Sequence, residues 1–536
     1  MKSWREVNAI YQIYPRSFMD SNSDGIGDIR GIISKLDYLK SRPDSLGVDA
    51  VWLSPFYPSP MADFGYDVSD YYGVHPMFGT ISDIKQLIFQ AHSRNIRVMI
   101  DFVPNHTSNE HEWFKAASES RDNPMRDFYV WRDAKSDGSP PNNWLSIFGG
   151  SAWEWHEETG QYYLHTFLKE QPDLNWDNVK VRWEMKKVLR YWMELGIDGI
   201  RADAVRWIAK DPDLRDDLLN PSYVEGHDPF DSLIHSNSRY GRDLFRYLKE
   251  LTDVIAEYDD RIMIFEDYPD SIYSTRDQYL GFYGINPHVS MPFNFEGMWA
   301  KWGAKHFAKF INEFQGMLRP EHVPVYCFGN HDQHRLATRF GHEQARLIAV
   351  LQLTLPGLPV VYYGDELGMK NVDIKPDEIQ DPVEIRKPGL GQGRDPERTP
   401  MRWSSEEYAG FSTAKPWLPV GEGYEDNNVD IERKQPQSFW YLYNQLLQAR
   451  AERTVLRSGE YRQIEVGGKD VFAYERSNDD EKIIVLLNFD SEPAYIEIPE
   501  RGRVIISSHA TDGIFTDAIR SFTLRPYAAL IVEIKS

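Results

Sequence analysis

The stretch GIDGIRADA (196–204) decides the fold, because it is an apolar strand that ends in charged side chains. Arg201 and Asp203 lie two residues apart, and alternate residues of a strand point to the same face. A carboxylate that leaves water is costly unless a partner compensates it. Two further stretches follow the same pattern: IMIFEDY (262–268), which contains Glu266, and VYCFGNHD (325–332), which ends in Asp332. Three such strand ends predict several strands that deliver acids to one site.

Strand-like runs alternate with helix-like segments through most of the chain. Amphipathic segments at 28–42 and 83–95 show apolar residues at helical spacing, and Ser82 or Asp83 is the expected N-cap of the second. Eight strands, each followed by a helix, predict an α/β fold of the (β/α)8 TIM barrel type. The expected strands are 9–15, 50–56, 96–103, 196–204, 262–268, 288–294, 323–330 and 358–366.

Residues 104–172 and 367–435 interrupt this alternation. Residues 104–172 are rich in Trp, Asn, Gly and Pro and predict an inserted domain B after the third strand. After a helix at 439–453, the chain turns into short alternating strands, which predict a C-terminal antiparallel β-sandwich, domain C, over 458–536. The barrel, domain A, would then comprise residues 1–103 and 173–457.

Charge and composition exclude some classes of partner. The net charge of −22 disfavours nucleic acid and anionic membranes, since both repel an acidic protein. The single cysteine, Cys327, permits no internal disulfide, and no run of about 18 apolar residues predicts a membrane span. The N-terminus has no signal-peptide pattern. These features together favour a cytoplasmic protein without membrane or nucleic-acid partners.

The polar residues at the strand ends indicate a reaction type. In barrel enzymes the active site forms at the carboxyl ends of the strands, and paired carboxylates there are typical of glycoside hydrolysis. The guanidinium of Arg201 beside Asp203 would favour the ionised carboxylate that a nucleophile needs. A metal site built from His106, Asp203, Glu266 and His331 is the alternative for the whole cluster, although no H-x-H or H-E-x-x-H spacing supports it.

The segment DSNSDGIGD (20–28) has the spacing of a cation-binding loop. Its acidic and amide side chains fall at positions 1, 3, 5 and 9 of an EF-hand-like loop, and Gly25 occupies the turn position. The bidentate Glu of a true EF-hand is missing, and a solvated turn is the alternative interpretation. We expect a structural Ca²⁺ or Mg²⁺ bound by Asp20, Asn22, Asp24, the carbonyl of Ile26, and Asp28.

Four motifs resemble the signature regions of glycoside hydrolase family 13, the α-amylase family, in order and at its usual intervals. Other stretches are similar to its α-glucosidase and oligo-1,6-glucosidase branch: QPDLNW (171–176) and RTPMRW (398–403). The resemblance spans nearly the whole chain. The four motifs are DFVPNH (101–106), GIRADAV (199–205), IFED (264–267) and FGNHD (328–332).

This resemblance implies roles for individual residues. Asp203 would be the nucleophile, Glu266 the general acid/base, and Asp332 the carboxylate that holds the sugar hydroxyls. Asp63 and Arg394 would clamp the non-reducing glucose, and the loop 20–28 would be the cation site of the branch. The remaining substrate-binding residues implied are Tyr66, His106, Phe148, Phe167, Arg201 and His331.

The resemblance also implies a substrate preference. Ala204 follows the nucleophile where members that prefer α-1,6 linkages carry Val, and His334 stands where Pro is frequent. We therefore expect a retaining exo-α-glucosidase that hydrolyses short α-glucosides, favours α-1,4 linkages, transfers glucosyl groups, and uses no organic cofactor. It would act as a monomer or homodimer. The alternatives are a sucrose hydrolase, sucrose isomerase or trehalose synthase on this scaffold, and a non-catalytic glucosidase-like scaffold.

Overall fold

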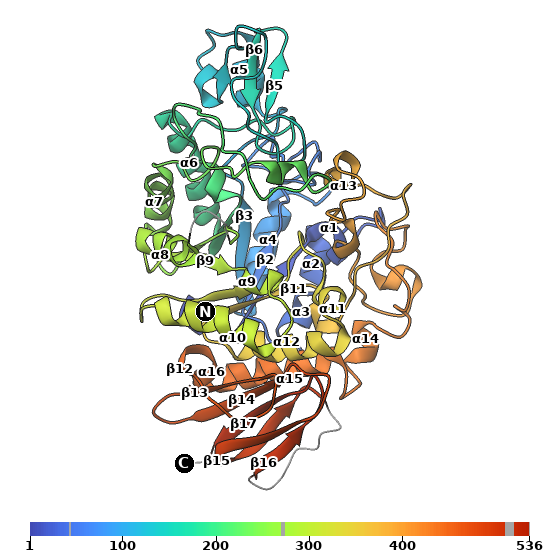
Figure 1. Ribbon diagram of the computed structural model, residues 1–536. Coiled ribbons are helices and arrows are strands. Elements are labelled where there is room, and N and C mark those ends of the chain that lie inside the picture. Colours follow the sequence, from blue (N-terminus) through green and yellow to red (C-terminus); the bar gives the residue numbers. More distant parts are fainter. Residues whose placement is uncertain (42–43, 270–273, 510–518, 535–536) are drawn as a thin grey trace.

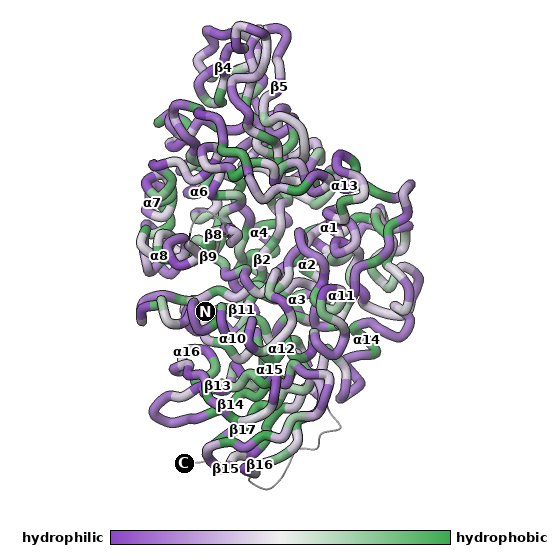
Figure 2. The backbone as a smooth tube through the Cα atoms, viewed as in Figure 1, coloured by the Kyte–Doolittle hydropathy of each residue, from purple (hydrophilic) through white to green (hydrophobic). Residues whose placement is uncertain are grey.

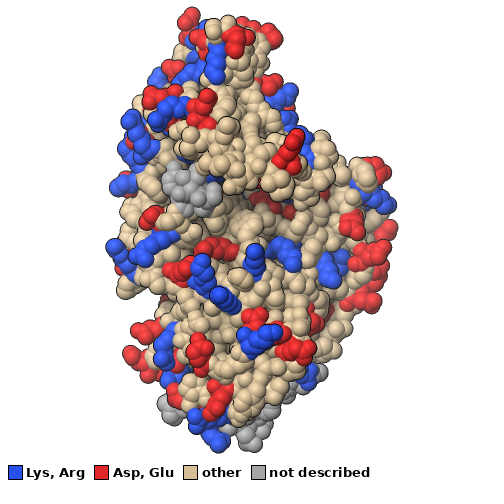
Figure 3. All heavy atoms as spheres, in the orientation of Figure 1, with Lys and Arg blue, Asp and Glu red and all other residues tan. Residues whose placement is uncertain are grey.

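A computed structural model describes residues 1–41, 44–269, 274–509 and 519–534. The barrel forms the middle of the molecule, the insert after strand β3 (Arg97–Phe102) projects from one end, and the C-terminal sheet covers the other end (Figure 1). Lys and Arg are scattered among Asp and Glu over the face shown in Figure 3, as expected for a well-solvated acidic surface. Within the described ranges, no helix has the length and apolar character needed to cross a membrane.

Eight parallel strands close into a barrel in the order β1-β11-β10-β9-β8-β7-β3-β2. Each strand is buried, which explains the nearly continuous apolar runs in the sequence. All eight strands predicted from the sequence are present. Their bounds are β1 (Ile10–Ile13), β2 (Ala50–Leu53), β3 (Arg97–Phe102), β7 (Gly199–Ala202), β8 (Ile262–Phe265), β9 (Ser290–Asn294), β10 (Val325–Cys327) and β11 (Leu358–Tyr362).

Strand register positions the charged residues. In the β3–β7 pair, Asp101 lies opposite Arg201, and in the β7–β8 pair Arg201 lies opposite Ile264. Glu266 follows the last residue of β8, and its N–H donates to the carbonyl of Ala202. The carboxyl ends of β3, β7 and β8 therefore lie side by side, each with an acid at or just after its end.

Two helix predictions need correction at their ends. Helix α4 (Ile81–Ser93) is capped by Thr80 and not by Ser82 or Asp83, because Asp83 is the third helical residue and accepts the Thr80 N–H at 2.9 Å. The segment predicted as one helix over 28–42 breaks at Lys35, whose backbone is not helical and whose ammonium lies 4.3 Å from the Trp403 ring.

Longer helices surround the barrel, and several short helices lie within the loops that connect its strands and helices. The helix predicted at 439–453 is present as α15. The bounds are α1 (Pro15–Phe18), α2 (Ile29–Ser34), α3 (Leu36–Leu39), α5 (Glu112–Glu119), α6 (Val179–Leu195), α7 (Leu244–Ile255), α8 (Thr275–Ile285), α9 (Glu296–Trp299), α10 (Ala304–Met317), α11 (Leu336–Arg339), α12 (His342–Thr354), α13 (Pro382–Arg386), α14 (Val429–Glu432), α15 (Phe439–Glu452) and α16 (Thr454–Ser458).

Two excursions rise above the carboxyl ends of the strands. The insert between β3 and α6 holds α5 and a small antiparallel sheet of β4 (Trp131–Arg132), β6 (Gln161–Leu164) and β5 (Trp153–His156). A second irregular segment, 205–243, follows β7 and was not anticipated from the sequence. Asn142 and Asn143 of the insert donate to the carbonyls of Leu214 and Asp217. The two excursions therefore brace each other over the barrel.

The C-terminal strands form one antiparallel sheet in the order β12-β13-β14-β17-β15-β16. Among the described residues, the strands predicted at 458–536 pair as one hydrogen-bonded sheet, in which β15 lies between β16 and β17 and its register shifts against both neighbours. One face packs on α10 and α12, and Figure 2 shows the apolar course of β14 and β17. The bounds are β12 (Glu460–Gln463), β13 (Val471–Ser477), β14 (Lys482–Asn488), β15 (Ala494–Ser507), β16 (Ile519–Leu524) and β17 (Ala529–Ile534).

Candidate active site

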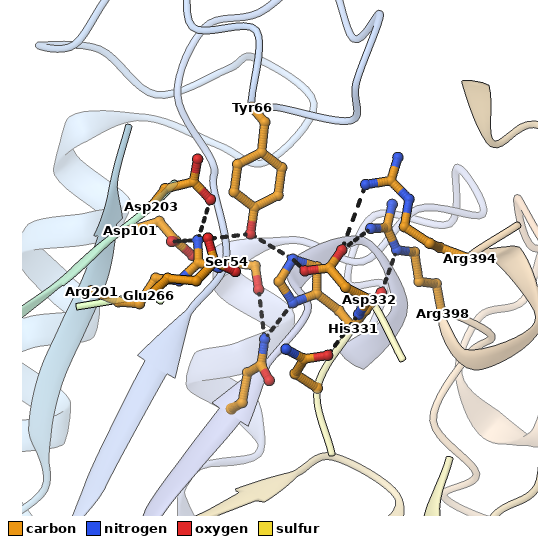
Figure 4. Close-up of polar contacts among 12 residues, drawn as sticks. Ser54, Tyr66, Asp101, Arg201, Asp203, Glu266, His331, Asp332, Arg394 and Arg398 are labelled. Carbon is orange, nitrogen blue, oxygen red and sulfur yellow. Dashed lines mark hydrogen bonds and ion pairs between the residues drawn. The ribbon is translucent and has the colours of Figure 1, made fainter. Parts of the chain in front are cut away.

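Arg201 lies at the centre of three carboxylates (Figure 4). Its Nη1 donates to Asp203 Oδ1 at 2.6 Å and to Asp101 Oδ1 at 2.5 Å. Its Nη2 donates to Glu266 Oε1 at 2.5 Å. A guanidinium presents several donors in one rigid plane, so it can hold acids from neighbouring strands around one point. The positive charge between these acids is thus a side chain of the barrel itself, which removes the need for a metal ion among them.

Glu266 is held by two further donors. The N–H of Ala204 donates to Oε2 at 2.8 Å, and the Tyr268 hydroxyl donates to Oε1 at 3.2 Å. Ala204 adopts a left-handed backbone with φ of 48°, which turns its N–H toward Glu266 directly after Asp203. The same turn therefore positions both acids.

Burial governs the protonation of Asp203. Removal from water raises the pKa of this carboxyl well above its usual range, and the charges of Glu266 and Asp101 act in the same direction. Arg201 lowers the pKa, as the sequence suggested, but it does not outweigh burial. Burial likewise raises the pKa of Asp101 to about 6, against the opposing charge of Arg201. Burial thus opposes the ionised form of Asp203, and the adjacent guanidinium of Arg201 favours it.

Asp332 has a different environment. Although burial alone would raise its pKa, His331, Arg398 and Arg394 together hold it below its usual range. Arg398 Nη2 donates to Asp332 Oδ1 at 2.8 Å, and Arg394 Nη1 lies 3.5 Å from the same oxygen. The three cationic or basic neighbours of Asp332 thus favour its ionised form, which accepts hydrogen bonds.

His331 and Tyr66 form the floor between these two groups of acids. Their rings are stacked 5.5 Å apart with an interplanar angle of 5°, and the Tyr66 hydroxyl lies 2.5 Å from His331 Nε2. Gln12 Nε2 lies 2.8 Å from His331 Nδ1. Burial holds the pKa of His331 well below its usual value. A neutral imidazole therefore lies beneath the site.

The end of the site beyond Asp332 is closed by an ion-pair network. Arg394 Nη2 lies 2.8 Å from Asp63 Oδ1 and 2.6 Å from Asp381 Oδ1. Gln171 Nε2 donates to Asp63 Oδ2 at 3.1 Å and lies 3.1 Å from His106 Nε2. Burial lowers the pKa of His106 to about 4. Charged and polar side chains thus close this end of the site, and these side chains have little contact with water.

These residues surround one cavity of about 360 Å³. Phe148 and Phe167 form an aromatic wall, with ring centroids 6.1 Å apart, and Phe148 lies 5.4 Å from the Arg394 guanidinium. Arg201 and His331 are buried directly beneath the lining. The residues predicted from the sequence that line the cavity are Asp63, Tyr66, His106, Phe148, Phe167, Asp203, Glu266, Asp332 and Arg394.

Residues 12–459 match the sequence model of the family described as "Alpha amylase, catalytic domain". The chain belongs to the α-amylase family. It is a hydrolase of that family, and the resemblance drawn from the four motifs is confirmed.

Members of the α-amylase family with similar sequences and structures span the whole chain. An oligo-1,6-glucosidase of Bacillus cereus is 38% identical, over 100% of both chains. The solved structure of the α-glucosyl transfer enzyme XgtA has a TM-score of 0.91 at 33% identity and also covers 100% of both chains. The trehalulose synthase MutB from Pseudomonas mesoacidophila MX-45 has a TM-score of 0.88 at 34% identity and covers 99% of each.

Sequence reasoning gave no role to four residues that complete this α-amylase-family site. Tyr268 lies two residues beyond Glu266, so strand alternation could have placed it on the same face. Arg398 follows Arg394 by four residues, and this spacing does not predict a shared site unless the tertiary fold is known. Gln171 comes from the end of the insert, and Asp101 was noted only as a strand-end acid.

The loop 20–28 lies apart from the cavity. Asp20 accepts the N–H groups of Asn22 and Ser23 at 2.9 and 2.8 Å, and Asp28 caps α2 through the Gly31 N–H at 2.7 Å. Within the described ranges, no group of three or more His, Cys, Asp or Glu is arranged to hold a metal ion. The loop offers only oxygen atoms as metal ligands, which suits Ca²⁺ or Mg²⁺. Some of these oxygens already accept hydrogen bonds from N–H groups of the loop itself.

Proposed function

We propose that this protein is a retaining, exo-acting α-glucosidase for short α-glucosides. The observation that carries the proposal is that Asp203 and Glu266, held by one guanidinium, face a cavity whose other end is closed by Asp63 and Arg394. A closed end beside the catalytic acids admits one terminal glucose and excludes the interior of a longer chain.

The two acids support a double displacement. Asp203 attacks C1 of the bound glucose while Glu266 gives its proton to the departing oxygen. Glu266 then removes a proton from water, which attacks C1 and releases Asp203. Retaining enzymes need carboxyl groups about 5–5.5 Å apart, and two acids on the same guanidinium fit this short separation. A sugar hydroxyl in place of water would give glucosyl transfer.

Ala204 supports a preference for α-1,4 linkages. It is 8% exposed, lines the cavity and donates to Glu266, so its side chain lies where the leaving group departs. The small methyl leaves room for a 4-linked leaving sugar, in line with the sequence expectation.

The anomer released from maltose tests the mechanism. A retaining enzyme releases α-glucose first, as polarimetry or NMR would show within the first turnovers; release of β-glucose would exclude the double displacement. Asp203→Asn should lower kcat by at least about 10⁴-fold, whereas Asp137→Asn, an exposed acid of the insert, should keep wild-type activity. Substantial activity of Asp203→Asn would remove this residue from the nucleophile role.

A second candidate function is isomerisation of sucrose. The likeness to trehalulose synthase MutB favours it as the alternative, because hydrolysis and isomerisation can share the same glucosyl-enzyme. Product analysis on maltose, isomaltose, sucrose and trehalose separates the two: glucose from maltose supports the glucosidase, whereas isomeric disaccharides from sucrose support the isomerase.

We also propose that the loop 20–28 binds a structural Ca²⁺ or Mg²⁺. The loop gathers three carboxylates within nine residues, and Asp20 and Asp28 are 5% and 4% exposed. Such a density of negative charge favours a counter-ion. Asn22 and Asp24, which are exposed, and the carbonyl of Ile26 would complete the set of oxygen ligands.

A further inference from the structure

A second cavity of about 450 Å³ adjoins the catalytic one. Tyr268 and Trp299 line both, so these two rings form a shared wall. They meet edge to face at 5.3 Å, and Tyr268 is also stacked on Phe295 at 4.7 Å. The wall is therefore supported from behind by a packed ring.

The second cavity lies on the side of the leaving group. Tyr268 contacts Glu266, which protonates the departing oxygen in the proposed mechanism, whereas Asp63 and Arg394 close the opposite end. The part of a bound substrate that extends beyond Glu266 on the leaving-group side therefore passes Tyr268 and Trp299. Trp299, the last residue of α9, is 50% exposed even though it stands at the edge of a cavity.

The chemistry of the second cavity suits a sugar ring. An aromatic face with a few polar groups is the usual composition of a carbohydrate-sized site. Burial raises the pKa of Glu296 to about 7, so its carboxyl can both accept and donate hydrogen bonds near neutral pH. Glu296, Lys301 and His306 form no ion pair with any described residue. Besides Tyr268, the cavity is lined by Pro269, Glu296, Trp299, Ala300, Lys301, His306 and Phe310.

We propose that this cavity binds the second leaving-side ring of an α-linked trisaccharide, while the first leaving-side ring lies against Tyr268 and Trp299. The inference rests on the proposed glucosidase function and extends it. It assigns α-glucosidic trisaccharides, in preference to disaccharides, as the substrate class of the site.

The test compares kcat/KM for maltotriose and maltose, and for isomaltotriose and isomaltose. We expect the wild type to favour the trisaccharide of at least one pair. Trp299→Ala and His306→Ala should lower that preference about fivefold to tenfold, since loss of an aromatic or hydrogen-bonding contact typically weakens binding by around 1–1.4 kcal/mol. Trp299→Phe should restore most of it.

Trp183→Ala is the matched control, because Trp183 is 54% exposed on α6 and does not line either cavity. It should leave the preference unchanged. The proposal is overturned if the wild type favours neither trisaccharide, or if the Trp299 and His306 variants keep the wild-type ratio.

A binding measurement separates this proposal from the glucosidase proposal. In the Asp203→Asn background, calorimetry should show maltotriose or isomaltotriose binding more tightly than its disaccharide, and Trp299→Ala should remove the difference. If wild-type enzyme releases no glucose from any of the four sugars, the glucosidase function fails. If glucose is released but affinity and kcat/KM are the same for the trisaccharide and its disaccharide, only the second-cavity assignment fails.

Discussion

Arg394 and Asp63 are 331 positions apart in the chain, yet Arg394 Nη2 lies 2.8 Å from Asp63 Oδ1 at the closed end of the cavity. Asp381 lies on the other side of the same guanidinium, and Asp332 is 3.5 Å from it. These three negative charges raise the pKa of Arg394 well above its usual value, although burial opposes them. One cation thus joins the closed end of the cavity to Asp332, one of the three proposed catalytic acids.

Replacement of this cation should damage both stability and catalysis. Arg394→Met leaves Asp63 and Asp381 without their counter-charge, and loss of one partner of a buried pair costs about 3–5 kcal/mol of unfolding free energy. We expect kcat/KM for maltose to fall by more than about 100-fold as well. Urea unfolding and steady-state kinetics measure the two effects. The control is Arg121→Met, which breaks an exposed ion pair with Asp133; an equal loss in both variants would contradict the assignment.

The stability of the site should depend on pH through His106. This imidazole is 1% exposed, and burial lowers its pKa from 6.5 to about 4. Between these values the unfolded chain binds a proton that the folded chain refuses, so acidification from pH 6.5 to 4 favours unfolding. The His106→Gln variant lacks this pH-dependent contribution to the free energy of unfolding.

The unfolding free energies of His106→Gln and wild type, measured by urea at several pH values, should therefore converge on acidification. The variant is less stable near pH 7.5, and the gap should narrow by about 3 kcal/mol at pH 4. A gap of constant size across this range would show that His106 does not stay neutral.

Ala204→Val tests the basis of linkage preference. Ala204 has φ of 48°, a conformation that is costly for a β-branched residue. We expect about 1–2 kcal/mol of destabilisation and a fall in kcat/KM for maltose relative to isomaltose, because the added methyl groups lie beside Glu266. Ala204→Gly is the control and should keep the wild-type ratio. An unchanged ratio in Ala204→Val would place linkage selection elsewhere.

Cation binding by the loop 20–28 should appear as thermal stabilisation. A ligand at 100 times its Kd stabilises the folded state by about 2.7 kcal/mol, so Ca²⁺ or Mg²⁺ should raise Tm and EDTA should lower it. Asp24→Asn should weaken the response. Asp137→Asn removes a carboxylate from another exposed turn and should keep it. Identical melting in EDTA and in millimolar Ca²⁺ or Mg²⁺ would exclude the site.

Arg450, on α15, joins the chain before β1, the end of α12 and α16, and it has no acid partner among the described residues. It is fully buried and donates to the main-chain carbonyls of Asn8, Leu353, Leu355 and Leu456 at 2.8–3.1 Å, and also to that of Gly357. Arg450→Met should lower the unfolding free energy by about 3 kcal/mol or more, because several buried acceptors lose their donor. Arg453→Met, a partly exposed control, should cost less than about 1 kcal/mol. Equal losses would show that water replaces the guanidinium.

Local pattern was sufficient for much of the fold. Apolar runs of strand length bounded by turns gave all eight barrel strands, including 290–294 despite Pro292. The positions of Asp203, Glu266 and Asp332 at strand ends followed from the same runs. Pattern was weaker for helix boundaries: Thr80 caps α4 because the reciprocal hydrogen bonds of a capping box outweigh single-residue propensity.

The sequence by itself determined the barrel, the identity of its acids and the family to which the chain belongs. Strand periodicity and sequence motifs depend only on residues that are close together in the chain. Only the tertiary structure decided what those acids experience. Barrel closure buries Asp203 and raises its pKa, places Arg398 against Asp332, and brings Trp299 beside Tyr268. These effects depend on distances between residues far apart in the chain and on exclusion of water, and neither is encoded in any local stretch.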